Sequence, residues 1–179
     1  MIKKKHRRKM PVLVPVCAVL IVVLGLVLLY GFFPTPYREA VDNAAERFGV
    51  DRALIYAVIK AESNFDPAAV SHAGAKGLAQ ITDNTAQYVA EMIGVEYGSG
   101  DSFDAEKNIS LSAAYLRYLL QKYNGDIRLA MAAYNAGEGN VDKWLAEDGE
   151  MKDIPFGETK KYVRKVKLYR RIYSILYPI

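Results

Sequence analysis

An apolar stretch without a charged residue, residues 11–33, most limits how this chain of 179 residues can fold. A helix rises about 1.5 Å per residue, so a stretch of this length spans roughly 30 Å, the thickness of the hydrocarbon core of a bilayer. Tyr30, Phe32 and Phe33 close the stretch with aromatic side chains of the kind that gather at a membrane interface. The sequence therefore predicts one transmembrane helix over residues 11–33.

The charge on the two sides of this stretch predicts an orientation. Residues 1–10 contain six lysines and arginines and no acid. Because basic flanks stay in the cytoplasm, we expect residues 1–10 to be a cytoplasmic tail. We expect residues 34–179 on the extracytoplasmic side of the cytoplasmic membrane, in a single-pass arrangement. The whole chain is +4 and the apolar stretch is uncharged, so residues 34–179 carry a net charge of −2. This balance does not favour a nucleic-acid partner for that part.

Two other interpretations of the apolar stretch are open. A cleaved secretion signal has the same basic start, but its apolar part is normally shorter, and residues 31–36 contain no Ala-x-Ala-like cleavage site. A lipoprotein carries its cysteine after the apolar part, whereas Cys17 lies within it. We therefore favour an uncleaved signal anchor. Cys17 is the single cysteine and forms no disulfide within the chain.

Residues 34–36, Pro-Thr-Pro, form a short stiff linker, after which the pattern changes. No later segment alternates polar and apolar residues, whereas several segments show the spacing of three and four residues that is typical of amphipathic helices. Turn and capping residues separate these segments. We predict an all-α domain over residues 37–179, with helices over residues 37–48, 52–63, 83–93, 104 or 108–123, 127–136 and 155–179.

The second of these helices places Glu62 where a carboxylate is normally unfavourable. Ile55, Ile59 and Glu62 share one helix face, which must be buried against another element. The partial negative charge of the helix C-terminus adds to the loss of water, and both raise the pKa of the Glu62 carboxyl. A carboxyl that stays protonated in a cleft can act as a general acid. A single Glu at a helix end is more often solvated or salt-bridged than catalytic. The other motifs of the chain must therefore show whether Glu62 is a catalytic acid.

Residues 71–80 form a loop rich in glycine and small residues, which lets the backbone approach a ligand closely. A simple tight connection is the alternative for this loop alone. His72 is the only histidine outside the tail and has no further metal-ligand residues spaced around it. We therefore expect no metal site and no cofactor.

Two later helices add aromatic and polar side chains. Tyr134 continues the apolar face of the helix over residues 127–136, with Asn135 at its end and Gly137 closing it. A buried phenol and amide need hydrogen-bond partners, which a sugar can supply. The last helix buries Tyr162 on an apolar face and carries lysines and arginines on its other sides. A solvated surface is the favoured interpretation of these cations, and an anion-binding role is the alternative.

Four segments, in this order, resemble the signatures of the soluble-type (SLT) lytic transglycosylase catalytic domain, a relative of goose-type lysozyme. They are residues 61–65 (AESNF), 71–80 (SHAGAKGLAQ), 133–137 (AYNAG) and 158–163 (ETKKYV). The resemblance extends from about Tyr37 to Tyr177, and the apolar helix before it looks like the anchor of membrane-bound, single-domain members. It implies a lysozyme-like all-α fold that cleaves the MurNAc–GlcNAc bond of peptidoglycan.

The resemblance also implies roles for individual residues. Glu62 matches the only catalytic carboxylate of the family. Other matching positions lie around the cleft, where the family uses them to orient the acid or to bind sugar: Ser63, Ser71, Gln80, Tyr134, Asn135 and Tyr162. Tyr162 is expected close to Glu62. We expect a monomer that binds peptidoglycan glycan strands, is attached to the membrane through its N-terminal helix and uses neither metal nor cofactor.

The chain departs from the family pattern at two places. Ala79 stands where a methionine is usual, which predicts a wider pocket wall, and residues 81–86 stand where a Met-Pro pair is common. Neither departure concerns the acid.

The chemistry implied for a single acid is non-hydrolytic and yields a 1,6-anhydro-MurNAc end. A hydrolytic muramidase is the alternative, and it requires a second carboxylate about 5–9.5 Å from the first. Asp66, Asp83 and Glu138 are the candidates for that second carboxylate. A non-catalytic wall-binding part of a secretion complex is a third possibility, but such a protein has no need of a buried acid.

Overall fold

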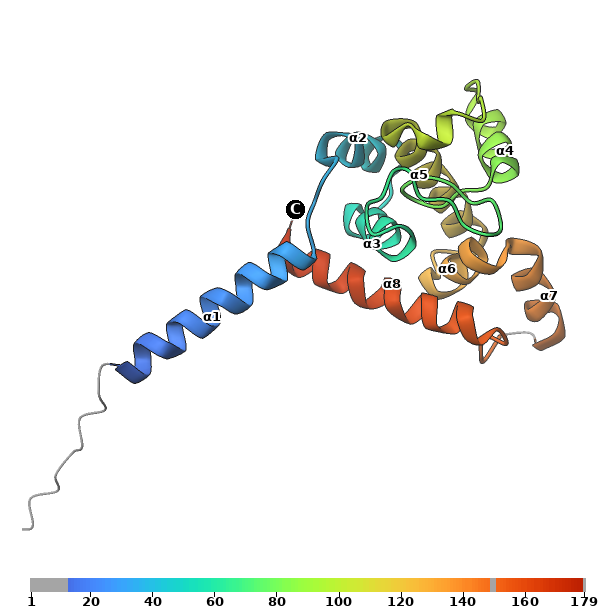
Figure 1. Ribbon diagram of the computed structural model, residues 1–179. Helices are drawn as coiled ribbons and strands as arrows, with labels where there is room; N and C mark the ends of the chain where they lie inside the picture. The colour runs from blue at the N-terminus through green and yellow to red at the C-terminus, as the bar shows by residue number, and fades with distance from the viewer. Residues whose placement is uncertain (1–12, 149–150, 179) are drawn as a thin grey trace, which may run out of the picture. The chain divides into compact units, whose positions relative to one another are not determined.

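The computed structural model describes residues 13–148 and 151–178 (Figure 1). It divides into two compact units, Met1–Pro34 and Thr35–Ile179. The basic tail over residues 1–10, the first two residues of the predicted transmembrane stretch and the last residue of the chain lie outside the described residues. The helices are α1 (Leu13–Phe32), α2 (Arg38–Phe48), α3 (Arg52–Glu62), α4 (Asp83–Ile93), η1 (Asp101–Phe103), α5 (Ala105–Lys122), α6 (Ile127–Ala136), α7 (Glu138–Asp148) and α8 (Gly157–Leu176).

The first unit consists of the apolar helix α1. The window Pro15–Phe32 has a mean hydropathy of 2.7, and α1 is long and apolar enough to cross a membrane. That α1 can cross a membrane follows from its length and composition alone.

The second unit is built around α3. Residues 53–60 of this helix are all buried. α8 packs along α3, and α2 and α5 contact it as well. The sequence predicted burial along one stripe, whereas the middle of α3 is buried all round, because three helices pack against it. The all-α prediction is confirmed: the described residues contain only two isolated bridges, Val70–Lys76 and Lys76–Ile81, and no longer strand.

Side-chain caps begin α3, α4 and α5. Asp51 accepts a hydrogen bond from the backbone N–H of Ala53 and begins α3. Thr82 caps α4, and of the two predicted starts of the next helix the structure has the earlier one, capped by Asp104. The helix α7 was not predicted, and α8 begins at Gly157, two residues later than expected.

The segment between α3 and α4 is an irregular loop held in unusual backbone conformations. Asn64, Phe65 and Gln80 have positive φ angles of 54°, 70° and 50°. Such conformations cost free energy in residues other than glycine and persist only where surrounding contacts fix them. Gly77, at φ 71°, allows a close approach: a Cβ there would lie 2.1 Å from the Ser102 carbonyl oxygen. This loop carries the second signature segment.

Candidate active site

Glu62 lies in the last turn of α3 and is only partly exposed. Loss of water around the carboxyl raises its pKa from the ordinary 4.5 to about 7, while the Tyr162 hydroxyl and the positive charge of Lys165 lower it. The expected direction of this shift is confirmed. Near neutral pH the carboxyl exists in both protonation states, so it can give a proton and take one back.

Tyr162 brings a buried phenol from α8 to this carboxyl. Burial raises the pKa of the Tyr162 hydroxyl well above 10, and the negative charge of Glu62 raises it further. The ring is 8% exposed, and its hydroxyl has no hydrogen-bond partner of good geometry among the described residues. A hydroxyl in this state is ready to accept or donate when the carboxyl changes its protonation or when a ligand enters.

Lys165 joins α8 to the end of α3. Its Nζ donates a hydrogen bond of 2.7 Å to the carbonyl oxygen of Ala61, next to Glu62. The ammonium therefore satisfies a carbonyl that the helix end leaves without an intrahelical partner, and it places a positive charge near the acid. The sequence grouped Lys165 with the solvated cations of α8. Helix periodicity could not show this contact, because it joins residues 104 positions apart.

Tyr134 approaches from α6. Its hydroxyl donates a hydrogen bond of 2.9 Å to the carbonyl oxygen of Ala79, and its ring lies 5.4 Å from the ring of Tyr115. Burial raises the pKa of Tyr134 well above 10, and the charge of Glu62 adds to this. The structure thus brings Glu62, Tyr134 and Tyr162 together from three helices.

Ser63 links the first signature segment to the second. It follows Glu62 as the C-terminal cap of α3, and its Oγ donates a hydrogen bond of 2.7 Å to the carbonyl oxygen of Leu78. Leu78 and Ala79 are fully buried. The serine therefore holds the loop against the end of the helix that carries the acid.

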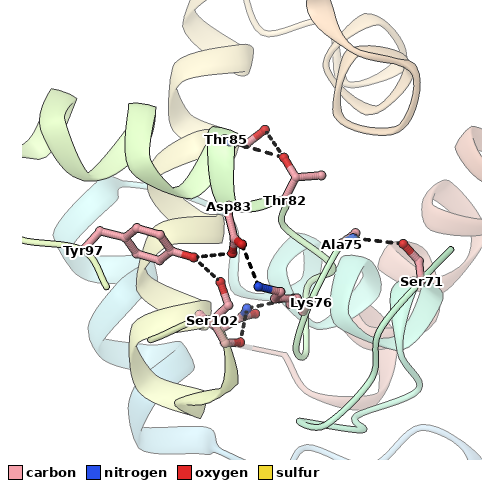
Figure 2. A network of polar contacts seen from close by, with 9 residues as sticks. Ser71, Ala75, Lys76, Thr82, Asp83, Thr85, Tyr97 and Ser102 are labelled. Atoms are coloured by element: carbon pink, nitrogen blue, oxygen red, sulfur yellow. Dashed lines mark hydrogen bonds and ion pairs between the residues drawn. The ribbon is translucent and has the colours of Figure 1, made fainter. Parts of the chain in front are cut away.

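Ser71 and Lys76 shape the loop itself (Figure 2). The Oγ of Ser71 accepts a hydrogen bond of 3.0 Å from the backbone N–H of Ala75, which closes the turn on itself. Lys76 donates to Asp83 at 2.6 Å, and Asp83 also accepts from the hydroxyl of Tyr97. These contacts tie the loop to the start of α4 and do not bring Ser71 to the acid.

Asn108 is a positioning residue that the sequence did not identify. It is buried at the start of α5, where its Oδ1 accepts from the backbone N–H of Ala79 at 2.8 Å. Its Nδ2 donates to the carbonyl oxygens of Lys76 and Ser102. All of these partners are main-chain atoms, and two of them lie 29 and 32 positions away in sequence, so only a possible helix start at Asn108 was predicted.

Gln80 and Asn135 line a cavity of about 240 Å³ beside Tyr134. The Nε2 of Gln80 donates to the carbonyl oxygens of Ala69 and Gly77, and the Oδ1 of Asn135 accepts from the Thr159 hydroxyl at 2.8 Å. The cavity has further walls from three segments: Ile81, Thr82, Thr85, Tyr115, Ala136 and Gly137. Its size and its mixture of aromatic and amide groups suit one sugar ring.

The three candidates for a second carboxylate are engaged elsewhere. Asp66 accepts from the backbone N–H of Ala68 in an exposed turn. Asp83 is paired with Lys76, and Glu138 accepts from the Tyr118 hydroxyl and pairs with Lys122. No carboxylate of the described chain contributes to the pKa of Glu62. Within residues 13–148 and 151–178, no group of three or more His, Cys, Asp or Glu residues is placed to hold a metal ion.

A family model described as the transglycosylase SLT domain matches residues 39–156. The chain belongs to the SLT transglycosylase family. The resemblance that the four signature segments indicated is confirmed.

Curated relatives and solved structures agree with this SLT assignment. The putative soluble lytic murein transglycosylase of Haemophilus influenzae is 36% identical over 80% of this chain and 26% of its own length. The membrane-bound lytic murein transglycosylase C of Edwardsiella ictaluri is 34% identical over 76% of this chain and 47% of its own length. The X-ray structure of an inactive Glu-to-Gln mutant of lytic transglycosylase Slt from Pseudomonas aeruginosa superimposes with a TM-score of 0.75 at 34% identity. It covers 80% of this chain and 25% of that one. This chain thus spans about a quarter to a half of the length of these proteins.

The chain departs from the SLT signature at position 79 and again over residues 81–86. Ala79 is fully buried and is not among the cavity-lining residues. The wider pocket wall expected at this position stays a prediction. The hydrogen bonds with Tyr134 and Asn108 are made by the backbone of Ala79, not by its side chain. Ile81 and Thr82 do line the cavity, so the second departure changes its surface.

Proposed function

We propose that the chain is a peptidoglycan lytic transglycosylase that cleaves the β-1,4 bond between MurNAc and GlcNAc, with Glu62 as its only catalytic carboxyl. The observation that supports this most is the isolation of Glu62: desolvation raises its pKa to about 7, and the three other candidate carboxylates have partners elsewhere. A glycosidase with two carboxylates needs its second one across the cleft. The single acid favours a mechanism in which no water is activated.

The proposed reaction uses one group twice. Protonated Glu62 donates its proton to the glycosidic oxygen, and the C1–O bond breaks as positive charge develops on the muramic ring. The Glu62 carboxylate then takes the proton from the C6 hydroxyl of the same ring while that oxygen attacks C1. The products are a free 4-hydroxyl on GlcNAc and a 1,6-anhydro-MurNAc end. A pKa near 7 serves both steps, because a group is an efficient acid and base when its pKa lies near the working pH.

The surrounding residues receive supporting roles in this proposal. Tyr162 orients the Glu62 carboxyl, and its hydroxyl accepts or donates a hydrogen bond as that carboxyl changes its protonation state. Gln80, Tyr134 and Asn135 border the cavity and contact the sugar and its N-acetyl group. Ser63 acts through the backbone, since its hydroxyl is used to hold Leu78. Ser71 shapes the loop through its contact with Ala75. A direct contact between Ser71 and the substrate stays a prediction.

We also propose how the chain is placed in the cell. The helix α1 anchors residues 34–179 to the cytoplasmic membrane as a monomer, with residues 1–10 inside, residues 34–36 as the linker and the catalytic domain over residues 37–179 outside. The support is the apolar helix with its basic flank and the membrane-bound relative.

The experiment is product analysis with purified sacculi. The detergent-solubilised full chain should release muropeptides with anhydro ends, which mass spectrometry detects as a loss of one water relative to reducing ends. Glu62→Gln, which keeps size and removes the proton, should lower the rate by at least about a hundredfold. Asp66→Asn is the matched control and should cleave like the wild type, since this carboxyl lies in an exposed turn.

Two results contradict the proposal. Reducing-end products that depend on Glu62 would show a hydrolytic muramidase. Binding to sacculi without cleavage, by wild type and Glu62→Gln alike, would show a wall-binding protein.

A further inference from the structure

Two further cavities lie at the opposite end of α3 from Glu62. One, of about 250 Å³, is lined by residues near the start of α3 and the end of α8, and a neighbouring one of about 240 Å³ adds Thr35 and Arg38. Both include Arg52, Tyr56, Tyr177 and Pro178. Neither contains a residue of the candidate active site.

The buried hydroxyl of Tyr56 distinguishes these cavities from ordinary gaps in packing. Tyr56 is only 3% exposed, lines both cavities, and its hydroxyl has no hydrogen-bond partner within the described chain. Burying a hydroxyl without a partner costs about 1–3 kcal/mol. The ring itself is well packed and stacks on Tyr173 at 5.3 Å. A hydrogen-bond acceptor from outside the fold would remove the cost of the hydroxyl.

The charges around Tyr56 indicate what kind of acceptor fits. Arg52 Nε lies 3.0 Å from Asp42 but in poor alignment, so that neither atom forms a good hydrogen bond. Arg38 lies 3.6 Å from the same carboxylate, and its side chain is 74% exposed. Asp51, the other acid here, is paired with Arg170. Asp42 is the charge that acts most strongly on the Tyr56 hydroxyl, ahead of Arg38 and Arg52. Because two arginines share this one carboxylate, the three side chains keep a net positive charge and N–H donors suited to phosphate oxygens.

The walls and the place of these cavities in the chain indicate the source of the phosphate. Tyr56, Tyr173 and Tyr177 form a stack of rings. Tyrosines gather at membrane interfaces, where arginines also act as anchors. Thr35, on the edge of the second cavity, follows the last residue of α1 by three positions. Three residues reach at most about 11 Å. If α1 is a membrane anchor, as proposed above, the chain keeps Thr35 within this distance of the membrane-spanning helix.

We propose that Arg38, Arg52 and the Tyr56 hydroxyl form a binding site for the phosphate group of a phospholipid, with the neighbouring aromatic cavity accepting the glycerol part. The site holds the domain against the headgroups at its membrane-linked end. Binding is reversible and makes or breaks no covalent bond.

The test uses the full chain in a neutral detergent with added dioleoyl phosphatidylglycerol. Native mass spectrometry reports the bound lipid, and a thermal unfolding scan reports stabilisation. Tyr56→Phe removes only the hydroxyl, so without lipid its melting temperature should equal or exceed that of the wild type. With lipid it should bind about tenfold more weakly, the effect of one hydrogen bond to a charged group. Arg38→Gln should weaken binding similarly, and Tyr88→Phe on α4 is the matched control that should bind like the wild type.

Three outcomes overturn the proposal. The first is equal lipid binding by wild type and Tyr56→Phe. The second is equal binding of a phosphate-free diacyl glycolipid, which would leave only hydrophobic contact. The third is equal stabilisation by inorganic phosphate or glycerol 3-phosphate, which would assign the site to a soluble anion. Because no glycan is present, these results are independent of whether the chain cleaves peptidoglycan.

Discussion

Glu62 is kept in an environment that its charged form disfavours. At the end of α3 the carboxyl has lost most of its water, and its compensating contacts come from Tyr162 and Lys165 alone. The balance leaves a pKa of about 7, where either stronger burial or a closer cation would have moved it away from neutrality. A group poised in this way serves proton transfer but weakens the fold whenever it ionises.

This conflict predicts a dependence of stability on pH. Below pH 4.5 the carboxyl is protonated in both folded and unfolded chains. Between pH 4.5 and 7 the folded chain keeps the proton that the unfolded chain releases, so the free energy of unfolding falls as pH rises through this window. Glu62→Gln is neutral throughout. Its unfolding free energy should match that of the wild type near pH 4 and exceed it by about 3 kcal/mol near pH 8.

Urea unfolding of the two proteins at both pH values measures this difference. Asp66→Asn, in an exposed turn, should show no such change between pH 4 and pH 8. An advantage of Glu62→Gln that is the same at both pH values would mean that the carboxyl is not desolvated in the folded chain.

At this scale the sequence identified the acid but not its supporting contacts. Helix periodicity placed Glu62 on a buried face, and from this the direction of its pKa shift followed. Lys165 and Asn108 were not identified, because each acts on main-chain atoms of a distant segment. Residue type and spacing carry no information about such contacts.

At the scale of elements, the loop between α3 and α4 depends on close backbone packing. Gly77 lies against the Ser102 carbonyl and the Asn108 side chain, with no room for a methyl group. Gly77→Ala should therefore lower the free energy of unfolding by about 2–4 kcal/mol, through both the clash and the positive φ. Gly98→Ala, at a glycine with open space around it, should change it by less than about 0.5 kcal/mol. Thermal unfolding compares the two variants, and equal melting temperatures would contradict this account of the loop.

Helices and caps were more predictable than the way they pack. The helix predicted over residues 52–63 agrees with α3 to within one residue, because capping, here by Asp51, is a local effect. Burial of α3 on all sides was not predicted, since it depends on which helices surround it. The sequence also gave no sign of α7, which has a weak apolar pattern and directly follows α6.

At the scale of the whole chain, two stretches of different composition form two compact units. The proposed orientation predicts that only the second unit is reached from outside the cell. In a Cys17→Ser background, a cysteine introduced by Lys143→Cys should react with a membrane-impermeant maleimide in spheroplasts, since the Lys143 side chain is 70% exposed. Lys4→Cys in the tail is the control and should react only after lysis. Reaction at both positions, or only at the tail, would contradict the orientation.

Main-chain atoms of Leu78 and Ala79 receive the hydroxyls of Ser63 and Tyr134, and Asn108 holds the same peptide from the other side. Each of these partners recognises an atom that every amino acid possesses. These hydrogen bonds therefore do not depend on which side chains stand at positions 78 and 79. Only the volume available in the interior limits those side chains. The same hydrogen bonds would therefore form with a methionine at position 79, and only the packing of the interior distinguishes the two residues there.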